Sequence, residues 1–153
     1  MKKILFLSAV LLFGLTSCNN ITSDGVMIDG VRWAMSNVDT PGTFARNPES
    51  TGSFFAWEEA QKACPRGWRL PTSEELRSLA NAIGSEWTTK NGVNGRIFGV
   101  VPHQIFMPAA SANGAFGIYW NDAGGFLQFV DPSLSGVNND NRAHEFSVRC
   151  VAE

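Results

Sequence analysis

The sequence predicts a small α+β domain closed by one disulfide. Apolar residues recur at helical spacing in the first half of the chain, and short β-prone runs separated by Gly, Asn and Pro fill the second half. The third observation is the pattern of cysteines, which is typical of an exported protein. With 153 residues and 44% hydrophobic residues, the chain is long enough for one domain and too apolar to be disordered.

The first segment has the features of a bacterial lipoprotein signal. Two lysines precede an apolar run, Ile4–Leu15, that is shorter than the roughly 20 residues of a membrane-spanning helix. The run ends in Leu15-Thr16-Ser17-Cys18, which matches the lipobox. We therefore expect a cleaved signal over residues 1–17, palmitate on Cys18 and a polar tether over 18–25. An ordinary cleaved signal with a stray cysteine is the alternative.

Charge and position 19 suggest where the mature chain acts. Asn19 is not the aspartate that retains lipoproteins at the inner membrane, so we expect the outer membrane, on either face. Loss of the two signal lysines lowers the formal net charge from −2 to −4. A nucleic-acid-binding protein needs a basic face, so we expect a membrane anchor and no nucleic-acid partner.

Cys64 and Cys150 remain after lipidation of Cys18. In an oxidising compartment, an even number of remaining cysteines is expected to form disulfides. A catalytic thiol or a metal ligand is the alternative, but no second cysteine lies nearby and His103 and His144 stand alone in the sequence. The bridge would stabilise the fold by about 4–5 kcal/mol at most in the chain-entropy model.

A hairpin and a first helix are predicted at the start of the domain. In residues 26–34 two β-prone runs flank Asp29-Gly30, a pair that tolerates the positive φ angles of a type I′ turn. Residues 39–53 have the composition of a surface loop. A helix is predicted over 54–64, with Trp57, Ala60, Ala63 and Cys64 on its buried face.

A second helix is predicted from Thr72. Thr72 as N-cap and Glu75 three residues later form a capping box. The buried stripe of this helix is predicted to contain Leu76, Leu79, Ala80 and Ile83, and Gly84 is predicted to end it. Arg69 lies between the two predicted helices, and Glu75 lies at the start of the second. We expect these two residues to form a structural ion pair or to bind the backbone.

The remainder is predicted to form short strands of a twisted antiparallel sheet with long loops. The last run alternates apolar and polar residues, which indicates a half-buried strand. Residues 131–142 are interpreted as a solvated loop. The expected strands are Arg96–Val101, Phe106–Met107, Gly117–Trp120, Phe126–Val130 and Glu145–Val151.

The run from Cys64 to Thr72, with Glu75 behind it, resembles the signature of the Fibrobacter succinogenes major paralogous domain. That family is common in lipoproteins of Bacteroidetes and Fibrobacteres. Tyr119-Trp120 and the run 147–151 are further family marks, and the resemblance places the domain at residues 26–153. The family resembles the C-type lectin-like fold, in which a first-helix cysteine pairs with one in the last strand, in agreement with Cys64 and Cys150.

The resemblance implies ligand binding through the late loops. We expect a non-catalytic binding or adhesion module for a carbohydrate or a protein; a structural or accessory subunit of a cell-surface assembly is the alternative. Trp33, Trp57 and Trp68 are expected in the core, whereas Trp87, in a polar stretch, is the tryptophan expected to be most exposed. The candidate ligand-binding residues are Trp87, Asn121, Asp122, Asn139, Asp140 and Arg142.

No metal, cofactor or enzymatic activity is expected. Trp120-Asn121-Asp122 resembles the motif with which sugar-binding lectins hold calcium, so Asn121 and Asp122 are the calcium candidates. Calcium takes six to eight oxygen ligands, however, and residues 106–110 supply no side-chain oxygen where those lectins place their second motif. A strand followed by a turn is the simpler interpretation. The sequence shows no nucleophile–base pair that would indicate catalysis.

Overall fold

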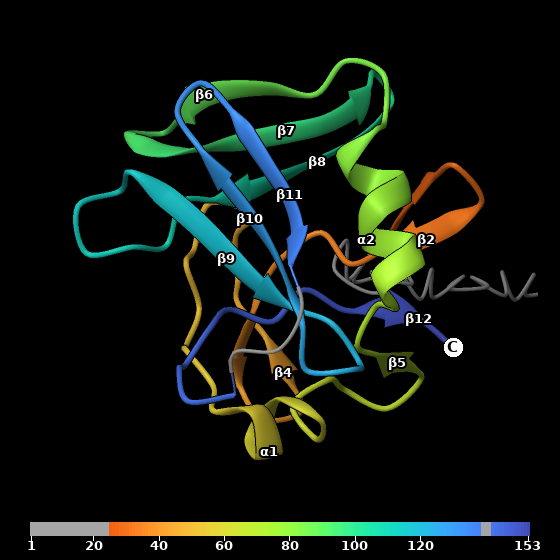
Figure 1. Ribbon diagram of the computed structural model, residues 1–153. Coiled ribbons are helices and arrows are strands. Elements are labelled where there is room, and N and C mark those ends of the chain that lie inside the picture. The colour runs from red at the N-terminus through yellow and green to blue at the C-terminus, as the bar shows by residue number, and fades with distance from the viewer. Residues whose placement is uncertain (1–24, 139–141) are drawn as a thin grey trace, which may run out of the picture.

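The computed structural model describes residues 25–138 and 142–153, and these residues form mainly strands (Figure 1). They contain twelve strands in four small antiparallel sheets and only two helices. The prediction of an α+β, C-type lectin-like fold with two early helices is therefore wrong. The predicted signal, Cys18, Asn139 and Asp140 lie outside the described residues.

The two ends of the domain meet in one sheet. Asp29 and Gly30 turn the first hairpin with φ angles of 47° and 81°, as the Asp-Gly pair predicts. The C-terminal strand then pairs with Trp33 on one side and Arg69 on the other. The sheet has the order β1 (Val26–Ile28), β2 (Val31–Trp33), β12 (Val151–Ala152) and β5 (Trp68–Arg69).

Two three-stranded sheets cross above this region, and Figure 1 shows α2 beside them. The first consists of β6 (Glu86–Lys90), β7 (Val93–Val100) and β8 (His103–Pro108). The second has the order β11 (Leu134–Asn138), β10 (Phe126–Val130) and β9 (Phe116–Trp120). Strands β7 to β10 lie where the sequence predicts strands. Strands β6 and β11, and the hairpin of β3 (Val38–Thr40) and β4 (Thr43–Phe44), lie in stretches interpreted as loops.

The first predicted helix is reduced to one turn. Helix α1 covers only Trp57–Ala60, and its N-cap residue Ala56 has no side chain that could accept a capping hydrogen bond. The four-residue helix still buries Trp57 and Ala60, as the apolar spacing predicts. A residue pattern of helical period is therefore compatible with a single turn followed by irregular backbone.

The second helix, α2, covers Ser73–Ala80 and has the predicted capping box. The Glu75 backbone N–H donates to Thr72 Oγ1 at 3.1 Å, and the Thr72 N–H donates to Glu75 Oε2 at 2.8 Å. The helix ends at Ala80, one turn earlier than the apolar stripe predicts. Ile83 consequently lies beyond the helix and is 85% exposed, so its assignment to the buried stripe is wrong.

The buried side chains form two clusters. One lies between α2 and the two three-stranded sheets and includes Trp33, Leu76 and Phe129. The other surrounds α1 and includes Trp57 and Val148, with Trp68 packed against it. The second cluster also contains the Cys64–Cys150 disulfide, whose Cα atoms are 6.0 Å apart. The predicted disulfide is therefore present.

Residues 146–151 are buried on both faces, although Ser147 Oγ has no hydrogen-bond partner among the described residues. Arg149 is fully buried and donates to Asn37 Oδ1, Ala34 O and Phe106 O at 2.9–3.0 Å. Burial away from any carboxylate lowers the pKa of Arg149 to about 10. The prediction of a half-buried strand is wrong here, and Arg149 instead joins the N-terminal segment to β8.

Candidate functional site

Asn121 is a structural residue in the turn after β9. Its side chain is fully buried, and its Oδ1 accepts hydrogen bonds from the backbone N–H groups of Ala123 (2.9 Å) and Gly125 (2.8 Å). Its Nδ2 donates to Ser73 Oγ at the start of α2 (2.9 Å). Two N–H donors already point at the oxygen that calcium would need, so the turn geometry does not suit a cation. The amide instead holds the turn against α2.

Asp122 and Arg142 lie at the same turn but are exposed. The Asp122 backbone N–H donates to Pro71 O at 2.9 Å, and this hydrogen bond fixes the backbone from which the Asp122 side chain extends. Arg142 Nη2 donates to Ala123 O at 3.3 Å, and its guanidinium carbon lies 5.6 Å from the Trp57 ring centroid. The structure thus brings three of the predicted ligand-binding residues together at one turn.

Trp87 lies apart from these residues. It is part of β6 rather than of a polar loop, and it is half-buried. Its ring packs edge-on against Phe129 of β10, with the centroids 6.3 Å apart. Trp87 therefore contributes to the junction of the two three-stranded sheets.

Arg69 and Glu75 form the expected ion pair. Arg69 Nη1 and Nη2 donate to Glu75 Oε2 (2.8 Å) and Oε1 (2.7 Å), and Nη1 also donates to Leu70 O (3.0 Å). Hydrogen bonds from Arg69 lower the pKa of Glu75, although burial opposes this shift. The same pair raises the pKa of Arg69, with smaller electrostatic contributions from Asp122 and Glu153. The Arg69 guanidinium is thus paired with one carboxylate, Glu75, and is influenced by two others.

Arg69, Asp122 and Glu153 line a hollow of about 360 Å³, which we call the polar hollow. Strand β5 supplies Trp68 and Arg69, the turn after β9 supplies Asp122, and the chain end supplies Glu153. A carboxylate accepts hydrogen bonds and a guanidinium donates them, so the hollow offers both kinds of partner beside an aromatic ring. Its lining residues are Gln61, Cys64, Trp68, Arg69, Leu70, Asp122 and Glu153.

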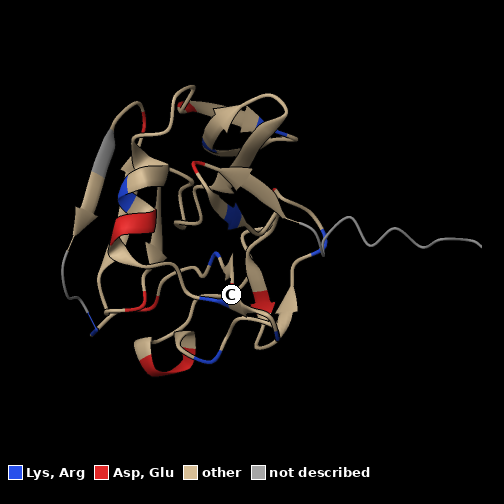
Figure 2. Ribbon diagram, turned by 90° about the vertical axis from the view of Figure 1, so that its right-hand side faces the viewer, with Lys and Arg blue, Asp and Glu red and all other residues tan. Residues whose placement is uncertain are grey.

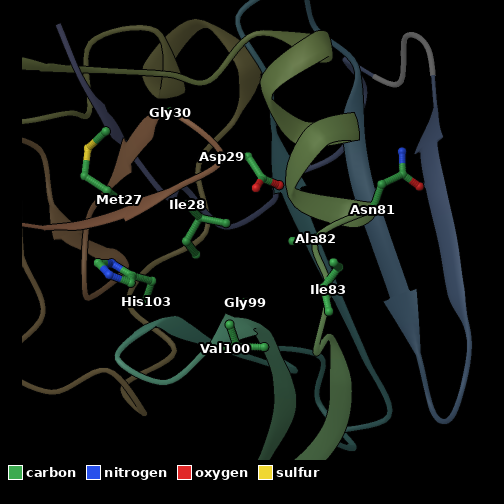
Figure 3. Close-up of a pocket in the computed structure, with 10 residues that line it drawn as sticks. All are labelled: Met27, Ile28, Asp29, Gly30, Asn81, Ala82, Ile83, Gly99, Val100 and His103. Atoms are coloured by element: carbon green, nitrogen blue, oxygen red, sulfur yellow. The ribbon is translucent and has the colours of Figure 1, made fainter.

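A second hollow, of about 550 Å³, is lined mainly by aliphatic side chains, and we call it the aliphatic hollow (Figure 3). Figure 3 shows Ile28, Ile83 and Val100 directed into it from three different segments, with His103 at its edge. Its volume lies in the range of small-molecule sites. The lining residues are Met27, Ile28, Asp29, Gly30, Asn81, Ala82, Ile83, Gly99, Val100 and His103.

Gly84, next to the lining residue Ile83, lets two segments of the aliphatic hollow approach each other closely. It has a φ of +83°, and a Cβ there would lie 2.5 Å from Val100 Cγ1 and 2.7 Å from Gly99 O. Only glycine therefore lets the segment after α2 pass against the end of β7. This close approach places Ile83 beside Val100.

Exposed aliphatic side chains surround this hollow. Ile83 and Val101 are 85% and 78% exposed, Val100 is 51% exposed and Met27 is 40% exposed. Figure 2, which faces this side, shows charged segments scattered among uncharged ones. The local sequence pattern does not reveal this group, because it predicts Ile83 in the core and a strand that ends at Val101.

A third, smaller hollow of about 250 Å³ has aromatic walls. Phe54 and Phe116 are 47% and 37% exposed at its rim, and Phe146 and Glu145 complete it. Its lining comes from Phe54, from the segment 110–118, which includes the start of β9, and from residues 145–146. Because it shares no lining residue with the aliphatic hollow, it is a matched control surface.

Neither a metal cluster nor a membrane-spanning helix occurs in the described part of the chain. No group of three or more His, Cys, Asp or Glu residues there is placed to hold a metal ion. None of its helices is long and apolar enough to cross a bilayer. Comparison of the chain with family models, curated proteins and solved structures gives no match.

Proposed function

We propose that this chain is an outer-membrane lipoprotein, anchored by acyl chains on Cys18, whose domain is a non-catalytic carbohydrate-binding module. Membership of the Fibrobacter succinogenes major paralogous family is part of the proposal and rests on the run from Cys64 to Thr72. A lectin-like fold is not part of it. The observation that carries the proposal is the polar hollow.

The side chains of the polar hollow match the chemistry of sugars. Sugar hydroxyls both donate and accept hydrogen bonds, so a site needs carboxylates or amides together with a cationic donor. Asp122, Glu153, Gln61 and Arg69 supply these groups around one hollow. The ring of Trp68 adds an apolar face against which sugar C–H groups can pack.

The polar hollow is also held in place before a ligand arrives. The Glu75 carboxylate fixes two nitrogens of Arg69, and the hydrogen bond from Asp122 N–H to Pro71 O fixes the neighbouring turn. A site with fixed polar groups loses less conformational entropy when it binds. Since Asn121 Oδ1 is occupied by backbone N–H groups, we propose that binding is independent of calcium.

A glycan array with the mature chain carrying Cys18→Ser tests the proposal, run with and without calcium. We expect a hit that is unchanged by calcium and that weakens at least tenfold with Asp122→Ala. The matched control is Asp29→Asn, an exposed carboxylate in the aliphatic hollow, which should leave binding unchanged. Silence on the array would contradict the carbohydrate ligand and favour the structural or accessory subunit.

The lipid anchor is tested separately by palmitate labelling and membrane fractionation. Wild-type protein should carry the label and sediment with the outer membrane. The Cys18→Ser variant should lose both properties. Continued anchoring of that variant would contradict the assignment of Cys18.

A further inference from the structure

We infer that the aliphatic hollow and its rim rest on the lipid bilayer in which the protein is anchored. The inference rests on the proposed lipid anchor at Cys18. It assigns a role to a surface that the carbohydrate-binding proposal leaves unused. The polar hollow takes no part in it.

The position of the hollow relative to the anchor is the first argument. The described chain begins at Gly25, and Met27, only two residues later, lines the hollow. Six residues lie between Cys18 and Gly25, and the seven Cα–Cα steps that join these two residues span at most about 25 Å when fully extended. An anchor at Cys18 therefore keeps β1, whose second half lines the hollow, within reach of the membrane surface.

The chemistry of the rim is the second argument. Its most exposed side chains, Ile83, Val100 and Val101, are all branched aliphatic residues. These side chains offer no hydrogen bond and no aromatic face. They suit lipid acyl chains, because contact with acyl chains is favoured simply by the removal of apolar surface from water. The polar groups of the lining, Asp29, Asn81 and His103, can meet lipid headgroups at the edge.

The rim is also distinct from scattered surface hydrophobics. Of the six large hydrophobic residues that are exposed in the described part of the chain, Met27, Ile83, Val100 and Val101 lie at this hollow or directly next to it in sequence. Gly84 holds two of its segments in close contact. A clustered apolar surface on an exported protein indicates an interaction site rather than chance exposure.

The test uses the lipidated full-length protein in vesicles of phosphatidylethanolamine and phosphatidylglycerol that contain doxyl-labelled lipid. A bimane probe is attached at Val101→Cys. Control probes are placed at Glu58→Cys on α1 and at Phe116→Cys on the aromatic hollow. We expect quenching by doxyl lipid to be at least threefold stronger at position 101 than at either control. Equal quenching at all three positions would overturn the inference.

A second variant shows whether the rim itself makes the contact. Ile83→Asn should reduce the quenching of the probe at position 101 by at least half. Phe54→Asn, a substitution of an exposed hydrophobic residue at the aromatic hollow, should not change it. A probe at position 101 that is shielded from aqueous iodide but not quenched by lipid would show a protein partner instead, and would overturn the inference.

The outcomes separate this inference from the proposed function. If the wild-type protein carries no lipid, the anchor fails and the membrane-facing role fails with it, whereas glycan binding is unaffected. If the protein is anchored but the probe at Val101→Cys is quenched no more than the controls, only the inference fails.

Discussion

The polar hollow and the aliphatic hollow differ in how their side chains relate to the fold. In the polar hollow, Arg69 also holds Glu75 at the start of α2, and Asp122 is fixed through its backbone to Pro71. At the aliphatic hollow, the lining residue Ile83 and Val101, which follows the lining residue Val100, are 85% and 78% exposed, and their side chains add little to the core. Substitutions behind the polar hollow should therefore change stability, whereas substitutions at the aliphatic rim should change interactions alone.

Asn121→Ala should give the largest effect, because it removes the residue that supports the turn behind the polar hollow. The backbone N–H groups of Ala123 and Gly125 and the Ser73 hydroxyl lose their partner. We expect a loss of about 2–4 kcal/mol in the free energy of unfolding, measured by urea denaturation. Asp122→Ala, at the exposed neighbour, should change it by no more than about 0.5 kcal/mol. A stable Asn121→Ala protein would show that the amide is not structural.

Gly84→Ala should have the second largest effect, because it disturbs the close contact between two segments at the aliphatic hollow. The added Cβ meets Val100 and Gly99 and must also adopt a positive φ, so we expect a loss of about 1–3 kcal/mol. Gly92→Ala is the matched control: its φ is +80°, but a Cβ there has no neighbour within 4 Å. Thermal unfolding should show a larger decrease in Tm for Gly84→Ala. Equal decreases would mean that the close contact is unimportant.

Glu75→Gln should lower the free energy of unfolding by less than these two substitutions, and the size of this loss should depend on pH. Arg69 is half exposed to solvent, so the pair is screened and we expect about 0.5–1 kcal/mol at neutral pH. The folded protein lowers the pKa of Glu75, so this stabilisation is complete above the unfolded-state pKa of about 4.3 and is lost as the pH falls through the folded-state value.

Urea denaturation of the wild-type and Glu75→Gln proteins from pH 7 to pH 2.5 measures this pH dependence. The difference in the free energy of unfolding between wild type and Glu75→Gln should be constant near neutral pH and shrink towards zero in acid. Glu74→Gln, on the same helix turn but exposed, should show a smaller difference. A difference that does not change with pH would contradict a stabilising charge on Glu75.

Calcium should give the smallest effect. Because Asn121 Oδ1 is occupied by two backbone N–H groups, we expect millimolar calcium to leave the Tm unchanged within about 1 °C. A ligand that binds the folded state raises the Tm, so an increase of several degrees would show a cation site. Asp122→Asn should then abolish the increase if the site is at this turn.

The local elements that the sequence predicted well are those with strong short-range chemistry. The capping box of Thr72 and Glu75, the Asp29-Gly30 turn and the Cys64–Cys150 pair are all present. The fold class was predicted wrongly because the helical spacing of Trp57, Ala60 and Ala63 was extended to a full helix, although Ala56 provides no cap.

The roles of the candidate site residues were harder to predict, because solvent exposure is not encoded in the local sequence pattern. Ile83 continues the apolar period of α2 in sequence, but the helix ends at Ala80 and leaves Ile83 at the surface. Asn121 is of a residue type that often binds ligands, but its Oδ1 accepts hydrogen bonds from the backbone N–H groups of its own turn. In both cases a contact made or lost in three dimensions decided the role.

The sequence by itself determined the turn residues, the helix cap and the cysteine pair, since each depends on residues close in sequence or on the even number of remaining cysteines. The tertiary structure decided the rest. It buried Arg149 among backbone carbonyls, gathered Arg69, Asp122 and Glu153 from separate segments, and placed Ile83 beside Val100 through the close approach at Gly84. The physical reason is that hydrogen-bond saturation and solvent exposure are set by residues distant in sequence, which meet only when the chain folds.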